Sequence, residues 1–247
     1  MQLKDKVALV TGGTSGIGAA TARRFAREGA WTYVLGRNAQ NGEAVVQEIL
    51  GFGGKARFVS CDVASEEDIE RAFNAVIGKA GTVDVLFNCA GVAPSGTIEE
   101  LCTDLWKKTF AINVESVYHF SRLAVPVMRK AGGGTIINVS SSAGTVGAWG
   151  MHLYAASKGA VVQLSRSMAA DYARENIRVN CLCPGATLTP MMDQLGAEGM
   201  QEFAKMIPAG RMASPDEIAN VALFLAGDQS SFMFGSTVLV DGGFTAI

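Results

Sequence analysis

Short apolar runs alternate along the chain with longer stretches in which apolar and polar residues recur at helical spacing. The runs expected to form strands are Val7–Val10, Thr32–Leu35, Ala56–Cys61, Val83–Asn88, Thr135–Ser140, Ile177–Cys183 and Thr237–Val240. The stretches expected to form helices are Ala19–Glu28, Gly42–Leu50, Glu66–Lys79, Thr103–Arg129, Leu153–Ala173 and Pro215–Ala226. Strands joined through helices run parallel, and nearly continuous apolar strands are typical of a sheet covered on both faces. The pattern predicts an α/β fold: a doubly wound parallel sheet of about seven strands, in a single domain spanning residues 1–247.

One segment breaks this alternation. From Leu188 to Ala213 the chain is rich in Met, Gly and Ala, and its periodicity is weak. Ligands of doubly wound sheets bind at the carboxyl ends of the strands, and loops there carry function. We therefore expect residues 188–213 to form a mobile lid over a substrate site.

Composition and charge exclude several classes of protein. The chain has 247 residues, 49% of them hydrophobic, and its 23 acidic and 21 basic residues leave a net charge of −2. This balance argues against a partner that is a nucleic acid or an anionic membrane. Neither a targeting segment nor an apolar run of about 18 residues is visible, so a cytoplasmic protein without a membrane span is expected. The five scattered cysteines favour reduced thiols, and the two distant histidines make a metal site unexpected.

A glycine-rich turn follows the first predicted strand. It reads Thr11-Gly-Gly-Thr-Ser-Gly-Ile-Gly18 and leads into the first predicted helix. Glycine permits a tight turn and lets backbone amides approach a bulky anion, and the helix N-terminus adds a positive field. Such a turn between the first strand and the first helix predicts a dinucleotide-binding site.

Tyr154 and Lys158 lie four residues apart on a predicted helix, so their side chains share one face. A protonated Lys158 would favour the phenolate and lower the pKa of Tyr154 from its free value of about 10. A phenol adjusted in this way can exchange a proton with an alcohol or a carbonyl group. The pair alone also fits an ordinary half-buried ring beneath a solvated amine.

Motifs over nearly the whole chain match one family in order. They are the turn Thr11–Gly18, Asn88-Cys-Ala-Gly91, Asn113, the strand end Ile136–Ser141, Tyr154-x-x-x-Lys158, Pro184-Gly185 with Thr189, and Asp241-Gly-Gly243. The chain thus resembles the short-chain dehydrogenases/reductases, in their compact single-domain branch. Cys89 departs from the family's pattern, because it replaces the second Asn of Asn-Asn-Ala-Gly. The resemblance implies a Rossmann-type fold and an NAD(P)-dependent oxidoreductase that interconverts a ketone and a secondary alcohol by hydride transfer.

The resemblance also implies a role for each matched residue. Tyr154 would exchange the proton, Ser141 would hydrogen-bond the same oxygen, and Lys158 would lower the Tyr pKa and hold ribose hydroxyls. Asn113 would anchor a water in a proton relay, or would be a buried helix Asn that bonds a neighbouring backbone. Ser141 is preferred over Ser140 and Ser142 because it stands thirteen residues before Tyr154 and opens Ser-x-x-Gly. The implied cofactor-binding residues are Gly12, Thr14, Ser15, Gly16, Ile17, Gly18, Arg37, Asp62, Val63, Asn88, Ala90, Gly91, Tyr154, Lys158, Pro184, Gly185, Thr187 and Thr189.

The end of the second strand bears on the choice of cofactor. An acid at position 36 would bond the adenosine ribose and repel a 2′-phosphate, but the residue is Gly36 and Arg37 follows. A guanidinium suits a phosphate, so NADP is preferred over NAD, although NAD is possible and Arg37 also fits a solvated loop charge. Asp62 resembles the family's acceptor for the adenine amino group, and it also fits a turn or N-cap residue; the two roles are compatible.

The expected substrate-binding residues are mostly apolar. They are Val92, Ser141, Trp149, Met151, Tyr154, Met191 and Met192, with neighbours at 93–95 and 145–151. A soft apolar wall without a cationic group favours an apolar or aromatic small molecule. Met191 and Met192 also fit packing of the lid onto the core or at a subunit contact.

Other readings stay open. A 3-oxoacyl-carrier-protein reductase would want a basic patch, for which Arg129-Lys130 is the candidate. A non-catalytic binding or regulatory protein would be expected to have lost Ser141, Tyr154 or Lys158. A halohydrin dehalogenase relative would carry Arg in place of Lys158, and an enoyl reductase relative a longer Tyr-to-Lys gap. The family is usually tetrameric, so we expect a homotetramer with contacts through Thr103–Arg129, Leu153–Ala173 and Phe232–Ile247.

Overall fold

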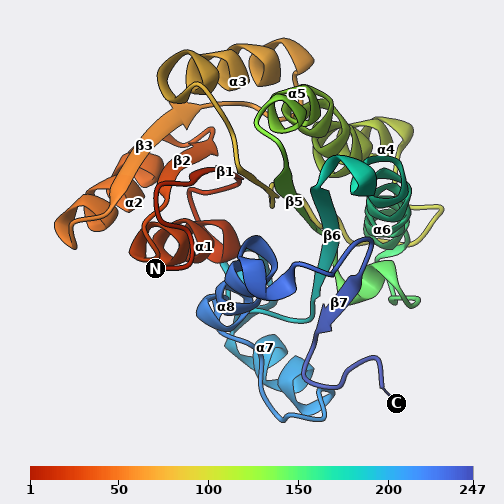
Figure 1. The fold of residues 1–247 in the computed structure, drawn as a ribbon. Helices are drawn as coiled ribbons and strands as arrows, with labels where there is room; N and C mark the ends of the chain where they lie inside the picture. Colours follow the sequence, from red (N-terminus) through yellow and green to blue (C-terminus); the bar gives the residue numbers. More distant parts are fainter. Residues whose placement is uncertain (247) are drawn as a thin grey trace.

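The computed structural model describes residues 1–246, which form one sheet of seven parallel strands in the order β3-β2-β1-β4-β5-β6-β7 (Figure 1). The strands are β1 (Val7–Thr11), β2 (Trp31–Gly36), β3 (Lys55–Ser60), β4 (Val85–Asn88), β5 (Gly134–Val139), β6 (Ile177–Pro184) and β7 (Thr237–Val240). The predicted α/β fold and its seven strands are confirmed. Ile247, which ends the predicted domain and the predicted contact segment, lies outside the described residues.

Helices cover both faces of the sheet (Figure 1). On one face lie α1 (Gly16–Arg27), α2 (Ala39–Gly51) and α8 (Pro215–Ala226); on the other lie α3 (Glu66–Ala80), α4 (Thr103–Phe110), α5 (Ser116–Lys130) and α6 (His152–Tyr172). Alternation within a strand divides the core accordingly, because successive side chains point to opposite faces. Ala8 and Val10 pack in the cluster with Phe25 of α1, whereas Val7 and Leu9 pack in the cluster with Phe120 of α5.

The helical stretch predicted as Thr103–Arg129 is interrupted. A turn of π-helix, Ala111–Glu115, joins α4 to α5, and the Ser116 N–H bonds the Ala111 carbonyl. Turns of this kind are rare and often accompany functional sites. Here the turn contains Asn113, which is wholly buried. Hydropathy gave no sign of the interruption, because a π turn adds one residue without changing which residues are apolar.

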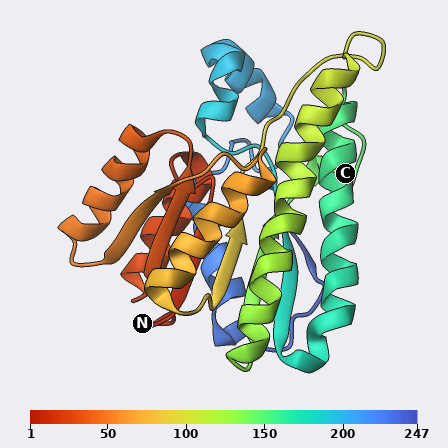
Figure 2. The ribbon, with the colours of Figure 1, turned by 90° about the horizontal axis from the view of Figure 1, so that it is seen from above.

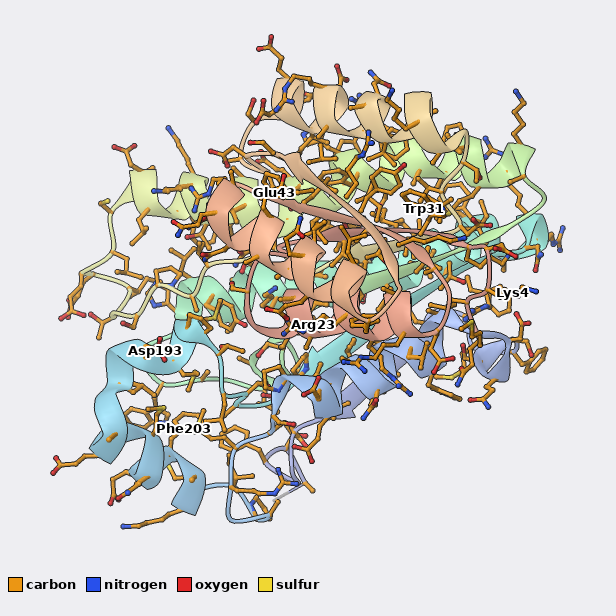
Figure 3. The ribbon with its side chains drawn as sticks, turned by 90° about the vertical axis from the view of Figure 1, so that its left-hand side faces the viewer. Lys4, Arg23, Trp31, Glu43, Asp193 and Phe203 are labelled. Atoms are coloured by element: carbon orange, nitrogen blue, oxygen red, sulfur yellow. The ribbon has the colours of Figure 1, made fainter. Side chains whose placement is uncertain are left out.

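The predicted lid contains a helix that the sequence analysis missed. Residues Pro190–Leu195 form a 3₁₀ helix and Gly196–Lys205 form α7, none of whose side chains is buried. Figure 2 shows α7 beyond the end toward which the strands point, and Figure 3 shows Asp193 and Phe203 at the end of the molecule opposite Lys4. The lid returns to the sheet at Ala213, which exchanges backbone hydrogen bonds with Ala186 and Leu188.

The strand order locates the crevice of the fold. β1 leads outward to β2 and β3, whereas the chain resumes with β4 on the other side of β1. Ligands of doubly wound sheets bind at the carboxyl ends of the strands where the order reverses in this way. Within residues 1–246 no helix is long and apolar enough to cross a membrane.

Candidate active site

A cavity of about 930 Å³ opens at the carboxyl ends of the strands. Its lining comes from the segments that follow all seven strands, and it runs from the glycine turn to the lid. Of the sequence-predicted catalytic, cofactor-binding and substrate-binding residues, all line it except Asn88 and Asn113; of the expected neighbours at 93–95 and 145–151, Pro94, Thr145 and Gly150 do not. The fold thus brings together residues that are up to about 230 positions apart, from Gly12 to Phe244.

The two ends of the glycine turn lie so close together that a side chain at Gly18 would not fit. Gly12 has a φ of 64°, and a Cβ atom at Gly18 would overlap the carbonyl oxygen of Gly12. The Thr11 hydroxyl accepts hydrogen bonds from the N–H groups of Cys89 (3.0 Å) and Ala90 (3.2 Å), which fixes the turn against the segment after β4. The first turn of α1 carries no acidic side chain, and no side chain caps it. Its amides are therefore suited to an anion.

The end of β2 presents one cation. Arg37 lines the cavity and is exposed, and it is absent from the ion pairs found among residues 1–246. A Cβ atom at Gly36 would lie 2.6 Å from the methyl group of Thr14, so an acidic side chain there would require Thr14 to move. Both features favour an anion beside Arg37.

Asp62 lines the same end of the cavity and also shapes the turn after β3. Its carboxylate accepts from the Ala64 N–H at 3.1 Å, while Ser65 is the N-cap of α3 and accepts from the Asp68 N–H. The turn alternative for Asp62 is therefore correct, and the N-cap alternative is wrong.

Ser141, Tyr154 and Lys158 converge at the centre of the cavity. The Ser141 hydroxyl lies close enough to the Tyr154 phenol to lower the pKa of Tyr154. The Lys158 ammonium lies 5.8 Å from the centre of the Tyr154 ring and donates to the Val139 carbonyl at 2.8 Å. Lys158 is only 4% exposed. A hydroxyl, a phenol and an ammonium are thus held beside one another by α6 and by the end of β5.

The electrostatics of this cluster correct one expectation. Burial raises the pKa of Tyr154 above its ordinary value, and the hydrogen bond from Ser141 offsets only part of that effect. Burial also lowers the pKa of Lys158. Lys158 was expected to lower the pKa of Tyr154, whereas in this structure desolvation of the phenolate raises it.

Buried polar side chains tie α6 to the segments around it. The Ser140 hydroxyl donates to the Lys158 carbonyl at 2.7 Å, and the Ser157 hydroxyl donates to the Tyr154 carbonyl at 2.7 Å. Asn113 donates to Ser157 at 2.9 Å and exchanges two hydrogen bonds with the backbone of Val92, at 2.8 and 2.9 Å. The Ser140 hydroxyl is thus used in a bond to the backbone, which agrees with the preference for Ser141 over Ser140. The Asn113 side chain links the loop after β4 to α6, so the alternative of a buried helix Asn that bonds a neighbouring backbone is confirmed. Its part in a proton relay through a water stays a prediction.

Asn88 was expected to bind the cofactor, but it is buried outside the cavity lining. Its amide donates to Asn138 at 2.9 Å, and Asn138 donates to Ser165 at 2.9 Å. Asn88 and Asn138 are direct neighbours across β4 and β5. This cross-strand pairing directs the Asn88 side-chain amide into the sheet and away from the cavity, and contact of Asn88 with the cofactor stays a prediction.

The far end of the cavity is apolar. The predicted residues Val92, Trp149, Met151, Met191 and Met192 all line it, and the Trp149 side chain is fully exposed. Sequence reasoning missed further lining residues from the lid and the C-terminal segment: Leu195, Phe203, Met206 and Phe244. Met200, Phe203, Ala204 and Ile207 are spaced as on one helical face, a signal that would have revealed α7.

No cluster of three or more His, Cys, Asp or Glu side chains suited to a metal ion occurs among the described residues. All five cysteines in the described part of the chain are free thiols.

The residues that line the cavity all lie in the part of the chain that resembles known proteins. Residues 12–245 match the family model described as enoyl-(acyl carrier protein) reductase. The chain is 40% identical to the cyclopentanol dehydrogenase of Comamonas testosteroni, over 99% of each chain. It is 40% identical to the NADP-dependent (R)-specific alcohol dehydrogenase of Lentilactobacillus kefiri, over 99% of this chain and 98% of that protein. It is 36% identical to the 3-oxoacyl-[acyl-carrier-protein] reductase of Chlamydia pneumoniae, over 98% of each chain.

Solved structures agree with these relatives. A short-chain type dehydrogenase/reductase from Mycobacterium marinum superposes with a TM-score of 0.96 at 33% identity, over 100% of this chain and 98% of that chain. A structure described as a putative NAD(P)-dependent gluconate 5-dehydrogenase from Beutenbergia cavernae, with bound NADP, superposes with a TM-score of 0.95 at 35% identity, over 100% of this chain and 99% of that chain.

Proposed function

The chain belongs to the short-chain dehydrogenase/reductase family, and from this premise we propose that it interconverts an apolar or aromatic ketone and its secondary alcohol, with NADP preferred as cofactor. The convergence of Ser141, Tyr154 and Lys158 in one cavity supports the proposal most directly. The family's oxidoreductase chemistry requires a proton donor beside the reacting oxygen, and Tyr154, which lines the cavity, would supply it.

The residues present fit a nicotinamide dinucleotide. The backbone amides of the glycine turn and of the start of α1 would accept the pyrophosphate, and Arg37 would face a 2′-phosphate. Asp62 would border the adenine end, and the segment Pro184–Thr189 would border the nicotinamide end. When bound, this cofactor would supply or accept the hydride.

The protein's own residues would move the proton. In reduction Tyr154 would donate its phenolic proton to the substrate oxygen, and the Ser141 hydroxyl would stabilise the charge that develops there. In oxidation the phenolate would accept the proton. Lys158 would hold a positive charge beneath the ring, and the Ser157–Asn113 chain would keep the helix that carries Tyr154 in place.

The apolar end of the cavity supports the proposed substrate class. Lys158 is the sole Lys or Arg among the lining residues beyond the Arg37 end. A carboxylate or phosphate on the substrate would therefore be desolvated without a partner, which is costly.

Reduction of a panel of ketones tests the proposal. The panel contains an aryl ketone, an alicyclic ketone, a 3-oxoacyl thioester and a sugar acid, and each is assayed with NADPH and NADH by nicotinamide absorbance. We expect the highest kcat/KM with an apolar ketone and NADPH. The highest value with the thioester would support the 3-oxoacyl-carrier-protein reductase instead, an alternative favoured by the relative that carries that name. Turnover of none of them would contradict the proposal and favour a non-catalytic role.

Arg37→Leu should change the choice of cofactor. Loss of a charge-assisted contact with a phosphate costs about 1.5–3 kcal/mol, so kcat/KM with NADPH should fall about 10- to 100-fold while the value with NADH stays within about threefold. The matched control is Arg57→Leu, because Arg57 is an exposed arginine on β3 outside the cavity lining. Equal losses with both cofactors would assign Arg37 a structural role.

The pH profile should differ between the two directions. Because burial raises the pKa of Tyr154, the phenol is protonated at neutral pH. The kcat/KM for reduction should therefore stay flat up to about pH 9, whereas that for alcohol oxidation should rise about tenfold per pH unit from about pH 7 to about pH 9. An oxidation profile that levels off near pH 7 would show that the pKa of Tyr154 is low in the working enzyme.

The proposal includes a homotetramer. Large apolar side chains stay exposed on α4 (Trp106), on α5 (Tyr118), just before β7 (Phe232) and on β7 (Leu239). β7 is one of the two edge strands of the sheet, and exposed apolar groups at such an edge suit contact with another copy.

A further inference from the structure

Two aromatic rings from distant parts of the chain meet at the apolar end of the cavity. Phe203 lies on lid helix α7 and Phe244 follows β7, and both line the cavity. Their ring centres are 6.2 Å apart and their planes differ by 17°, so the rings stack nearly parallel to one another. Neither residue belongs to the motifs that identify the family, and neither has a part in proton transfer.

A short turn after β7 holds Phe244 in place. The Asp241 carboxylate accepts hydrogen bonds from the N–H groups of Gly243 (3.0 Å) and Thr245 (2.9 Å) and from the Thr245 hydroxyl (2.6 Å). The turn is continuous with the sheet, because β7 pairs with β6 and the Gly185 N–H bonds the Val240 carbonyl at 3.0 Å. Phe244 is therefore presented from the body of the protein and not from the lid.

The same turn positions the lid. The Ala209 N–H donates to the Gly242 carbonyl at 3.0 Å, and a Cβ atom at Gly242 would lie 2.7 Å from a methyl group of Ile207. Ile207 is buried and closely follows α7. The lid thus rests directly on the turn, which explains how Phe203 reaches Phe244 although few other contacts hold α7.

We propose that Phe203 and Phe244 form one aromatic wall that makes the enzyme select ketones and alcohols carrying a flat hydrocarbon ring over linear or polyhydroxylated ones. This inference rests on the proposed function. Aromatic faces stabilise a ring against them beyond what simple burial of area supplies. Hydroxyl groups at the same place would lose water without gaining partners, since the neighbouring lining residues Leu195 and Met206 are apolar.

Substitution of the two rings tests the inference. In Phe203→Ala and in Phe244→Ala, kcat/KM for a phenyl ketone should fall about tenfold, whereas that for 2-butanone should change less than about threefold. Because the rings act as one surface, the double variant should lose less than the product of the single losses. The Kd for NADPH, measured by fluorescence, should stay within about twofold of the wild type.

A binding measurement separates this inference from the proposed function. The affinity of 1-phenylethanol for the protein saturated with NADP, measured by calorimetry, should fall about tenfold in each variant whether or not turnover is observed. Phe244→Leu, which keeps most of the volume, checks for collapse of the turn. Phe52→Ala is the matched control, because Phe52 is a partly exposed ring outside the cavity lining.

Each outcome bears on the inference. An unchanged ratio of phenyl ketone to 2-butanone in both alanine variants, with wild-type turnover intact, would overturn the inference and leave the proposed function standing. Weaker binding of 1-phenylethanol in the variants, with no ketone reduced by the wild type, would support the aromatic wall and overturn the proposed function. Equal losses for all substrates and for NADPH would overturn the aromatic wall, because they would indicate a general collapse of the lid.

Discussion

Tyr154→Phe should lower kcat for ketone reduction by about 10²- to 10⁴-fold, the range expected when a general acid is removed. The ring is retained, so its packing against Lys158 and the shape of the cavity should persist. The Ser141 hydroxyl would remain to hydrogen-bond the substrate oxygen, which leaves some transition-state stabilisation but no proton donor. The Kd for NADPH should stay within about twofold, because the glycine turn is unaffected. Stopped-flow absorbance gives kcat, and fluorescence titration gives the Kd.

Tyr172→Phe is the matched control for this experiment. Tyr172 ends the same helix, α6, and lies outside the cavity lining, so loss of its hydroxyl should leave turnover within about twofold. Turnover by Tyr154→Phe within a few-fold of the wild type would show that another group supplies the proton, and the proposed mechanism would be wrong.

Arg178→Met should strongly lower the free energy of unfolding. Arg178 is 7% exposed and donates five hydrogen bonds, to Thr135 Oγ1, Ser230 Oγ and the carbonyls of Ala226, Gly227 and Ser230. Two of these carbonyls close the C-terminus of α8, where a cation is favoured. Methionine fills similar space but leaves buried acceptors without donors, so the free energy of unfolding should fall by about 3 kcal/mol. Urea unfolding followed by circular dichroism measures this change.

Arg166→Met is the matched control for that loss. Arg166 is exposed on α6 and makes one hydrogen bond, to the Thr237 hydroxyl at 3.2 Å, so its removal should change stability by less than about 0.5 kcal/mol. Turnover of Arg178→Met at low temperature should be close to that of the wild type, because Arg178 lies at the start of β6, away from the cavity. Equal stability of the two variants would show that the acceptors around Arg178 are satisfied by other means.

The architecture could be predicted because its signals are local. Strand-like runs and helical stretches were each visible within about ten residues, and their alternation requires parallel strands. The glycine turn and the Tyr154–Lys158 spacing were equally local, and the structure places both in the cavity. The π turn at Asn113 was missed because it brings no change in hydropathy. Helix α7 was missed although Met200, Phe203, Ala204 and Ile207 have helical spacing, because this short apolar face lies in a segment rich in Gly and Ala.

Hydropathy and residue spacing could not predict the contacts between segments that are distant in the sequence. Asn88 turns to Asn138 because β4 and β5 are neighbours, and Phe203 meets Phe244 because the lid rests on the last turn. The upward direction of the Tyr154 pKa shift also depends on such contacts, since burial of the phenol is its largest cause. Hydropathy and residue spacing establish which elements form and which chemical groups are available. Desolvation and side-chain pairing arise when distant elements pack together, and they decide how those groups behave.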